Sequence, residues 1–328
     1  MEHIDLRGTS TTNGKTTGSG QRCEQVATGV WRLRILFANV YLVAAEDDQW
    51  VLIDAGLKGA GRKIKEAAAQ LFGEDKPPAA IILTHGHFDH IGALPYLLSI
   101  WDTSVYAHPM EMPYLTGRAA YPPADPFAGG GLMSWMSFLY PNQPADLNGR
   151  ITALNKDGSL PHLLSWRYLH TPGHAPGHIS LFRDTDSVLI VGDAFVTTRQ
   201  ESVFSILFQK MQLSGPPKYF TYDWESAAAS VKSLQELNPS IAASGHGKPM
   251  HGHELTEGLI RLVKDFEQIA VPSSGRYVKT PARVNKRGVT ELPEPTNRMP
   301  GRIGTVVAAL AAIAIVGGLV WMRMKKPK

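Results

Sequence analysis

The chain has 328 residues, 43% of them hydrophobic, which is enough for a sizeable core in one large domain or two. Its net charge of +4 is unevenly placed, because residues 271–328 hold 11 Lys/Arg against 2 Asp/Glu, a net +9, and residues 1–270 therefore carry −5. We expect no nucleic-acid partner for such a folded part, and the single cysteine, Cys23, excludes an internal disulfide framework.

The order of short apolar runs and amphipathic segments predicts an α/β domain over residues 23–270, preceded by a disordered Thr/Gly/Ser-rich tail over 1–22 without a signal peptide. Strands are expected at 30–33, 39–44, 50–53, 79–84, 105–108, 166–169, 188–191 and 241–245. Helices are expected at 61–72, 91–100, 223–237 (with Asp223 as N-cap) and 254–269. This alternation is typical of a sheet with both faces covered.

A cluster of metal-binding residue types follows the strand predicted at 79–84, where the chain reads HGHFDH. Neutral imidazole nitrogens and carboxylate oxygens are good ligands for zinc and similar divalent ions. His85 and His87 can hold one ion, while Asp89 and His90 can turn to a second. A polar turn is the alternative interpretation.

Three further candidates, His174, Asp193 and His246, each lie just after a strand or strand-like run. If those strands lie side by side, the three residues meet the first cluster at one sheet edge. Residues 112–150 interrupt the pattern with proline, glycine, aromatic residues and methionine, which indicates either an ordered flap near a pocket or a surface insertion.

This ordered set, His-x-His-x-Asp-His, then His, Gly-Asp and Gly-His, resembles the metallo-β-lactamase-fold hydrolases, which include the glyoxalase II and lactonase branches. The resemblance covers about residues 24–265 and implies an αββα four-layer sandwich with a two-metal site between its halves. It implies that two divalent ions, expected to be Zn²⁺, are bound by seven residues: His85, His87 and His174 for the first ion, Asp89, His90 and His246 for the second, and Asp193 as the bridge. His178 and Asp54 match positions that orient the ligands.

Two adjacent cations can deprotonate a water between them and polarise the oxygen of a substrate. Asp89 is the candidate catalytic residue that orients this nucleophile and handles its proton. We therefore expect a dinuclear hydrolase for a small ester, lactone or thioester, with aromatic residues of 195–222 and 127–140 forming a partly apolar wall. The alternatives are a membrane-tethered metal-binding or sensor protein without catalysis, and a mononuclear iron oxygenase on the same fold.

The C-terminal part changes character after residue 270. Residues 271–302 predict a Pro-rich basic linker, and 303–322 form a run of 20 residues without charge, followed by a basic tail at 323–328. At 1.5 Å per residue such a run covers the ~30 Å of a bilayer core, so we expect a transmembrane helix.

The predicted helix would make the protein a single-pass membrane protein with a C-terminal anchor. The absence of a signal peptide favours a cytoplasmic hydrolase domain, whereas the flanking charge, five basic residues before and four after, does not set the orientation. Small residues at Gly304, Ala308 and Ala312 are compatible with a homodimer.

Overall fold

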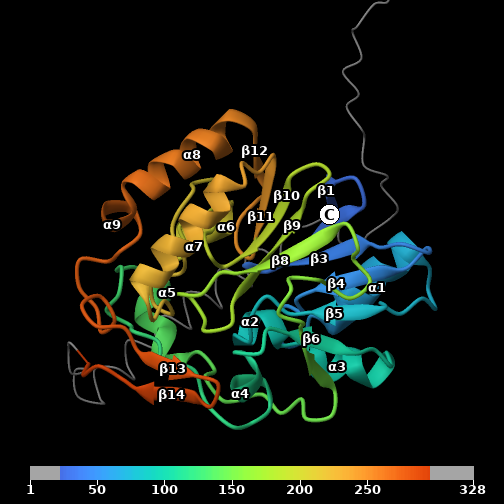
Figure 1. The fold of residues 1–328 in the computed structure, drawn as a ribbon, viewed down its shortest axis with the longest axis horizontal. Coiled ribbons are helices and arrows are strands. Elements are labelled where there is room, and N and C mark those ends of the chain that lie inside the picture. Colours follow the sequence, from blue (N-terminus) through green and yellow to red (C-terminus); the bar gives the residue numbers. More distant parts are fainter. Residues whose placement is uncertain (1–22, 296–328) are drawn as a thin grey trace, which may run out of the picture.

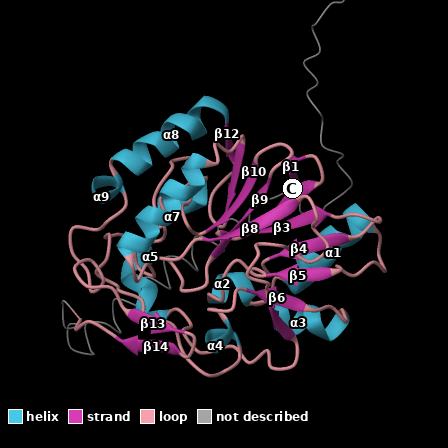
Figure 2. Ribbon diagram, in the orientation of Figure 1, coloured by secondary structure: helices cyan, strands magenta, loops and turns pink. Residues whose placement is uncertain are grey.

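Two β-sheets stacked face to face, with helices on their outer sides, make up the protein (Figure 1). The computed structural model describes residues 23–295. Helices lie outside and strands inside in Figure 2. The predicted αββα sandwich is confirmed over this part of the chain.

The first sheet has seven strands in sequence order: β1 (Glu24–Ala27), β2 (Val30–Ile35), β3 (Ala38–Ala44), β4 (Trp50–Ile53), β5 (Ala80–Ile82), β6 (Val105–Ala107) and β7 (Ile151–Ala153). Pairing is antiparallel from β1 to β4 and parallel from β4 to β7. Helices α1 (Gly61–Phe72) and α3 (Leu94–Ile100) cover its outer face, where Ile64 and Leu97 pack in one apolar cluster with Leu52 and Ile81.

The second sheet has the order β12 (Met250–His251), β11 (Ile241–Ser244), β10 (Val188–Gly192), β9 (Ile179–Arg183) and β8 (Trp166–His170). Only β10 and β11 pair in parallel. Helices α7 (Trp224–Glu236) and α8 (Gly252–Lys264) cover this sheet, with Val231 and Leu259 in its outer apolar cluster. Asp223 caps α7 as predicted, because its carboxylate accepts a hydrogen bond from the Ser226 amide at 3.0 Å.

The layer between the sheets is an apolar core contributed by both. Ile53 and Ile82 of the first sheet share it with Leu181 and Ile190 of the second, and all four are fully or almost fully buried. Burial on both faces explains why β4, β5 and β10 are continuous apolar runs rather than alternating ones.

Two helices expected from the pattern are divided in the structure. The segment predicted as one helix over 91–100 is divided at Gly92: Ile91 is the last residue of α2 (Phe88–Ile91), and α3 begins only at Leu94, because the Gly92 amide donates to the Gly56 carbonyl at 2.7 Å instead of continuing a helix. The segment over 254–269 divides into α8 and α9 (Phe266–Ile269) at Asp265, whose φ of −113° and ψ of 34° are not helical.

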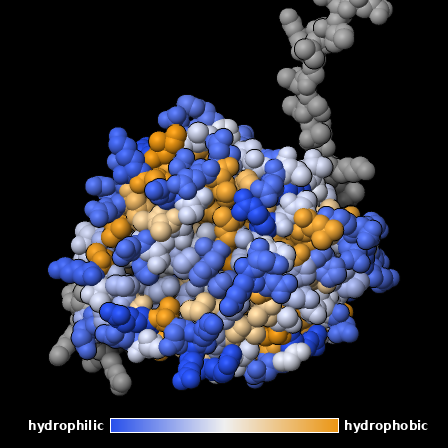
Figure 3. Space-filling model, viewed as in Figure 1, coloured by the Kyte–Doolittle hydropathy of each residue, from blue (hydrophilic) through white to orange (hydrophobic). Residues whose placement is uncertain are grey.

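The insertion over 112–150 is ordered and contains α4 (Met112–Leu115), α5 (Leu132–Met136) and the 3₁₀ helix η1 (Ser137–Leu139). A further short helix, α6 (Val203–Phe208), follows β10. On the face that Figure 3 shows, hydrophobic residues lie in several separate groups between hydrophilic ones, as is usual for a protein surface.

Residues 271–295 differ from the linker expected there. They contain a two-stranded sheet of β13 (Arg283–Asn285) and β14 (Gly288–Glu291), and Tyr277 is buried beside Tyr222. The Tyr277 hydroxyl also donates to the Pro123 carbonyl at 2.7 Å. One buried aromatic residue and a short hairpin therefore attach this segment to the domain without the periodicity that sequence patterns detect.

The expected membrane span is corrected by the structure. Among residues 23–295 no helix is long and apolar enough to cross a bilayer. The longest, α7 and α8, have 13 residues each, which gives about 20 Å against the ~30 Å required. The segments 1–22, 303–322 and 323–328 lie outside the described residues. The described fold is thus the sandwich without a transmembrane helix. The expected single-pass membrane localisation, which depended on that helix, is corrected in the same way.

Candidate metal centre

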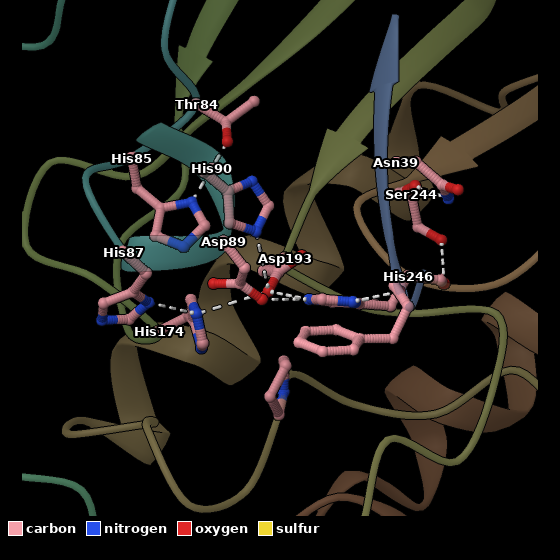
Figure 4. Close-up of polar contacts among 12 residues, drawn as sticks. Asn39, Thr84, His85, His87, Asp89, His90, His174, Asp193, Ser244 and His246 are labelled. Atoms are coloured by element: carbon pink, nitrogen blue, oxygen red, sulfur yellow. Dashed lines mark hydrogen bonds and ion pairs between the residues drawn. The ribbon is translucent and has the colours of Figure 1, made fainter. Parts of the chain in front are cut away.

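The seven candidate ligands meet at one edge of the sandwich, between the ends of the two sheets (Figure 4). All seven residues are buried, and none is more than 6% exposed. They come from the turn after β5 (His85, His87), from α2 (Asp89, His90), from the loop between β8 and β9 (His174), and from the chain just after β10 (Asp193) and β11 (His246). Because β10 and β11 run parallel, their carboxyl ends place Asp193 and His246 side by side.

Three overlapping groups in the described part of the chain are close enough to hold a metal ion. In each group the ligand atoms lie within 4.8 Å of one another. The groups are His85, His87 and His174; His85, His90 and Asp193; and Asp89, His90 and His246. All seven residues predicted from the sequence are therefore brought together, and the first and third groups match the two sets that the resemblance implies.

Asp193 lies between these groups. Its Oδ2 atom is 3.0 Å from His246 Nε2, 3.5 Å from His174 Nε2 and 3.6 Å from His90 Nε2. Figure 4 shows its carboxylate between the histidines of the first group and His246. A Cβ atom on Gly245 would lie only 2.1 Å from Asp193 Oδ1, so the chain after β11 can pass this carboxylate only as glycine.

Hydrogen bonds set which nitrogen of His85 and His90 faces the centre. Asp54 Oδ2 lies 2.8 Å from His90 Nδ1 and accepts the Thr84 hydroxyl proton, also at 2.8 Å. Since that hydroxyl donates to Asp54, it can only accept at 3.1 Å from His85 Nδ1. Both rings thus carry a proton on Nδ1, which leaves Nε2 as the atom that faces the centre.

Two more contacts hold the centre from the second sheet. His178 Nε2 accepts a hydrogen bond of 2.8 Å from the Asp193 backbone amide, and burial lowers the pKa of His178 to about 3, so the ring is neutral. His246 Nδ1 donates to the Phe37 carbonyl at 2.8 Å, which turns its Nε2 toward Asp193. Asp54 and His178 therefore act as predicted, by orienting other groups.

The electrostatics keep His85, His174 and Asp193 in metal-binding form. Burial, reinforced by neighbouring histidines, holds the pKa values of His85 and His174 well below 6.5, so both rings are neutral. Burial by itself would raise the pKa of Asp193, but His246 and His90 hold it well below its usual range, so this group is a carboxylate.

Burial by itself would lower the pKa values of His90 and His246, but the carboxylates of Asp54 and Asp193 raise that of His90 well above 6.5, and Asp193 raises that of His246, so these two rings release a proton when they bind an ion. Neutral imidazoles beside an anionic oxygen form the donor set that a divalent cation requires.

Several polar atoms here have no hydrogen-bond partner among the described residues: His85 Nε2, His90 Nε2, His174 Nδ1 and Asp193 Oδ1. A buried polar atom without a partner costs about 1–3 kcal/mol, so native proteins rarely cluster them without a compensating ligand. Two of these four atoms, His85 Nε2 and His90 Nε2, are the nitrogens that the hydrogen bonds at Nδ1 leave facing the centre. The residues present therefore fit a divalent metal ion.

An aromatic wall covers one side of the centre, as expected in part. Phe220 stacks on His87 with ring centroids 4.5 Å apart, and Tyr140 of the insertion lies 6.0 Å from Phe220. Phe195 instead belongs to the core behind the second sheet, and Phe208 is 68% exposed. The sequence pattern did not distinguish aromatic residues of the wall from those of the core or the exposed surface, because such residues occur in all three places.

Three residues at the centre were not predicted: Phe37 from the β2–β3 turn, and Glu111 and Tyr121 from the chain around α4. Phe37 stacks at 6.1 Å on His246, and Tyr121 lies 4.7 Å from His87. No spacing rule marks them, since each reaches the centre only through the packing of its loop. The proline-punctuated 112–150 stretch was the one available signal, and it contains only Tyr121 of the three.

The fold and the centre together define a family. Residues 33–246 match the family model described as the metallo-beta-lactamase superfamily. The chain therefore belongs to this superfamily, as the resemblance implied.

Among curated proteins, the chain is 46% identical over 247 residues to the "Probable metallo-hydrolase YflN" of Bacillus subtilis (strain 168), covering 75% of this chain and 94% of that protein. It is 27% identical to the "Probable metallo-hydrolase YybB" of the same bacterium, covering 69% and 89%.

Solved structures confirm the fold alone. The metallo-beta-lactamase family protein TTHA1429 of Thermus thermophilus superposes with a TM-score of 0.52 at 20% identity, covering 74% of this chain and 81% of that one. A beta-lactamase domain protein of Burkholderia ambifaria gives a TM-score of 0.53 at 21% identity, covering 77% and 78%.

Proposed function

We propose that the protein is a dinuclear hydrolase of the glyoxalase II and lactonase-like branch that cleaves a small ester, lactone or thioester. The class of metal-dependent hydrolase rests on membership of the superfamily and on relatives named as probable metallo-hydrolases. The number of ions, the branch and the substrate go beyond that class. The observation that carries the proposal is the position of Asp193, whose Oδ2 lies within 3.6 Å of histidines from both groups.

In this proposal His85, His87 and His174 hold one ion, and Asp89, His90 and His246 hold the other. Asp193 belongs to both sets. Two divalent ions bound there, which we propose to be Zn²⁺, would supply a hydroxide nucleophile near neutral pH and polarise the carbonyl oxygen of the substrate. The remaining steps depend on side chains of this protein.

Asp89 is the proposed catalytic residue. It lies in α2 with its Oδ2 atom 3.5 Å from His246 Nε2, and its side chain is buried. Burial raises the pKa of Asp89, which makes this carboxylate a better proton acceptor than an exposed one. We assign it the orientation of the attacking water and the uptake of its proton.

The wall beside the centre supports a substrate with an apolar part. Phe220 and Phe37 stack on His87 and His246, and Tyr140 extends the same surface to Phe88 at 5.4 Å. Such a surface also excludes water from the reacting group and strengthens the electrostatic interactions inside. We propose a small-molecule substrate with such an apolar part.

The first test is elemental analysis of metal content on the purified full chain. Two zinc ions per chain are expected. One iron ion per chain would favour the oxygenase alternative, and no bound metal after refolding with zinc would contradict the proposed ligand set.

The second test is the Asp193→Ala variant in a screen of lactones and thioesters. We expect it to lose most of the turnover, because both metal groups lose a shared ligand. Asp223→Asn is the matched control, since it changes a helix-capping carboxylate remote from the centre. Near-wild-type turnover by Asp193→Ala would contradict the proposed function.

A further inference from the structure

A buried glutamate connects the two loops that carry the histidines. Glu111 lies between β6 and α4, and its side chain is fully buried. Its Oε2 atom accepts a hydrogen bond of 2.9 Å from the Gly86 amide and another from the Tyr121 hydroxyl. Its Oε1 atom accepts one of 2.6 Å from the Gly177 amide. Every oxygen of this carboxylate is therefore occupied by the protein itself.

The two amides belong to different halves of the molecule. Gly86 lies between His85 and His87, after β5 of the first sheet, and Gly177 lies in the loop of the second sheet that also carries His174. These loops must come together for the first metal group to form, since His87 Nδ1 and His174 Nε2 are 2.9 Å apart across them. Glu111 thus crosslinks the loops beside the point where their histidines meet.

The backbone is shaped for this crosslink. A Cβ atom on Gly177 would lie 2.7 Å from the Glu111 amide nitrogen, 2.8 Å from its Cγ and 3.0 Å from its Oε1. A Cβ atom on Gly86 would lie 2.5 Å from the Tyr121 hydroxyl oxygen. Any side chain at either position would displace the carboxylate or the phenol that contacts it.

A second link between the halves lies at the base of the same loops, where the Ile179 amide donates to the Thr84 carbonyl at 2.9 Å. This bond belongs to the backbone and does not depend on Glu111. Loss of the Glu111 carboxylate should therefore release the loop tips, which carry the histidines, while the sheets remain joined.

We propose that Glu111 is a positioning residue of the metal centre, which sets the distance between the His85–His87 turn and the His174 loop so that their ring nitrogens reach one ion. The inference rests on the metal site of the proposed function. Hydrogen bonds from backbone amides to a carboxylate are charge-assisted and short, which suits them to fix a distance. Groups that orient metal ligands in this way typically affect metal affinity about 10–100-fold.

The test is the Glu111→Gln variant of the full chain. Glutamine keeps the volume but has only one acceptor oxygen, so one of the two backbone amides loses its partner. We expect the Zn²⁺ affinity, measured by competition with a chromophoric chelator, to fall about tenfold or more. The visible absorption bands of the Co²⁺-loaded variant should also shift, because the ligand geometry around the ion changes.

Asp125→Asn is the matched control. Asp125 is also a buried carboxylate that accepts two backbone amides, from Phe127 at 3.0 Å and from Arg276 at 2.5 Å, but its neighbours carry no candidate ligand. We expect Asp125→Asn to lower the unfolding temperature while its Zn²⁺ affinity and Co²⁺ spectrum stay as in the wild type. Gly177→Ala is a second test variant. It leaves Glu111 unchanged in sequence but forces its side chain out of position, so it should weaken Zn²⁺ binding as Glu111→Gln does.

The outcomes separate this inference from the proposed function. Wild-type affinity in both Glu111→Gln and Gly177→Ala overturns the positioning role while the metal site stands. An equal loss of affinity in Asp125→Asn overturns it as well, because general destabilisation would then explain the effect. A wild-type chain that binds no divalent ion overturns the proposed function, and the positioning role falls with it.

Discussion

Replacing Asp54 by asparagine tests how the hydrogen bonds behind the centre control the metal. Asp54 is buried, and its φ of 62° lies in the left-handed region, which asparagine adopts readily, so the backbone tolerates the change. The Asp54 carboxylate accepts hydrogen bonds from the Thr84 amide at 2.7 Å and from the Thr84 hydroxyl at 2.8 Å. It also lies 2.8 Å from His90 Nδ1. Only the charge and one acceptor atom are lost.

The magnitude follows from that lost acceptor. In either orientation of the asparagine amide, its NH₂ group replaces an oxygen that accepted a hydrogen bond, either from the Thr84 amide or from the Thr84 hydroxyl and His90 Nδ1. If it meets His90, the ring relieves the conflict by moving its proton to Nε2, the atom that lies 3.6 Å from Asp193 Oδ2 and should bind the ion. A hydrogen bond to a charged group contributes about 1.5–3 kcal/mol. We therefore expect Zn²⁺ affinity to fall about 10- to 100-fold.

The assay is chelator competition with the wild type, Asp54→Asn and the control Asp223→Asn. The control exchanges the same groups at a helix N-cap, where asparagine is equally good, so its affinity should match the wild type. Thermal unfolding of the metal-free proteins shows whether all three are folded. Equal Zn²⁺ dissociation constants for Asp54→Asn and the wild type would refute the reasoning about the His90 proton.

Three further predictions concern packing, pH and capping. Gly245→Ala places a Cβ atom 2.1 Å from Asp193 Oδ1, so the carboxylate must move. Elemental analysis should then find less metal per chain than in the wild type, and a wild-type metal content would contradict the close approach. Burial lowers the pKa of His108 from 6.5 to about 4, so the unfolded chain binds a proton first as the pH falls. Urea unfolding of the metal-free protein should therefore show stability declining from pH 6.5 to about 4, less steeply in His108→Gln, and identical slopes would rule this out. Asp223→Ala removes the N-cap of α7 and should cost about 1 kcal/mol in the same assay, whereas no measurable loss would mean that packing alone holds the start of this helix.

Elements with strong local signals were predictable. Helix α1 begins and ends where the pattern indicated, and α7 begins at its predicted cap, because amphipathic spacing and capping act within a few residues of chain. Strand β9 was not predicted, although it lies between β8 and β10 and carries Ile179 to the link with Thr84. Although Pro176-Gly177 marks a turn before it, only three of its five residues are apolar, so its apolar run is weaker than that of β10.

The sequence by itself determined which chemistry was available: the residue types and order of seven candidate ligands, placed at or shortly after strand ends, imply a metal-dependent centre on an α/β fold. Only the tertiary structure decided how those ligands are oriented. Asp54, His178 and Glu111 lie far along the chain from some of the groups that they hold, at contacts such as the 2.6 Å bond between Glu111 and Gly177. Local sequence patterns record the conformation of neighbouring residues, whereas ring orientation and loop spacing depend on packing between segments that meet only when both sheets have formed.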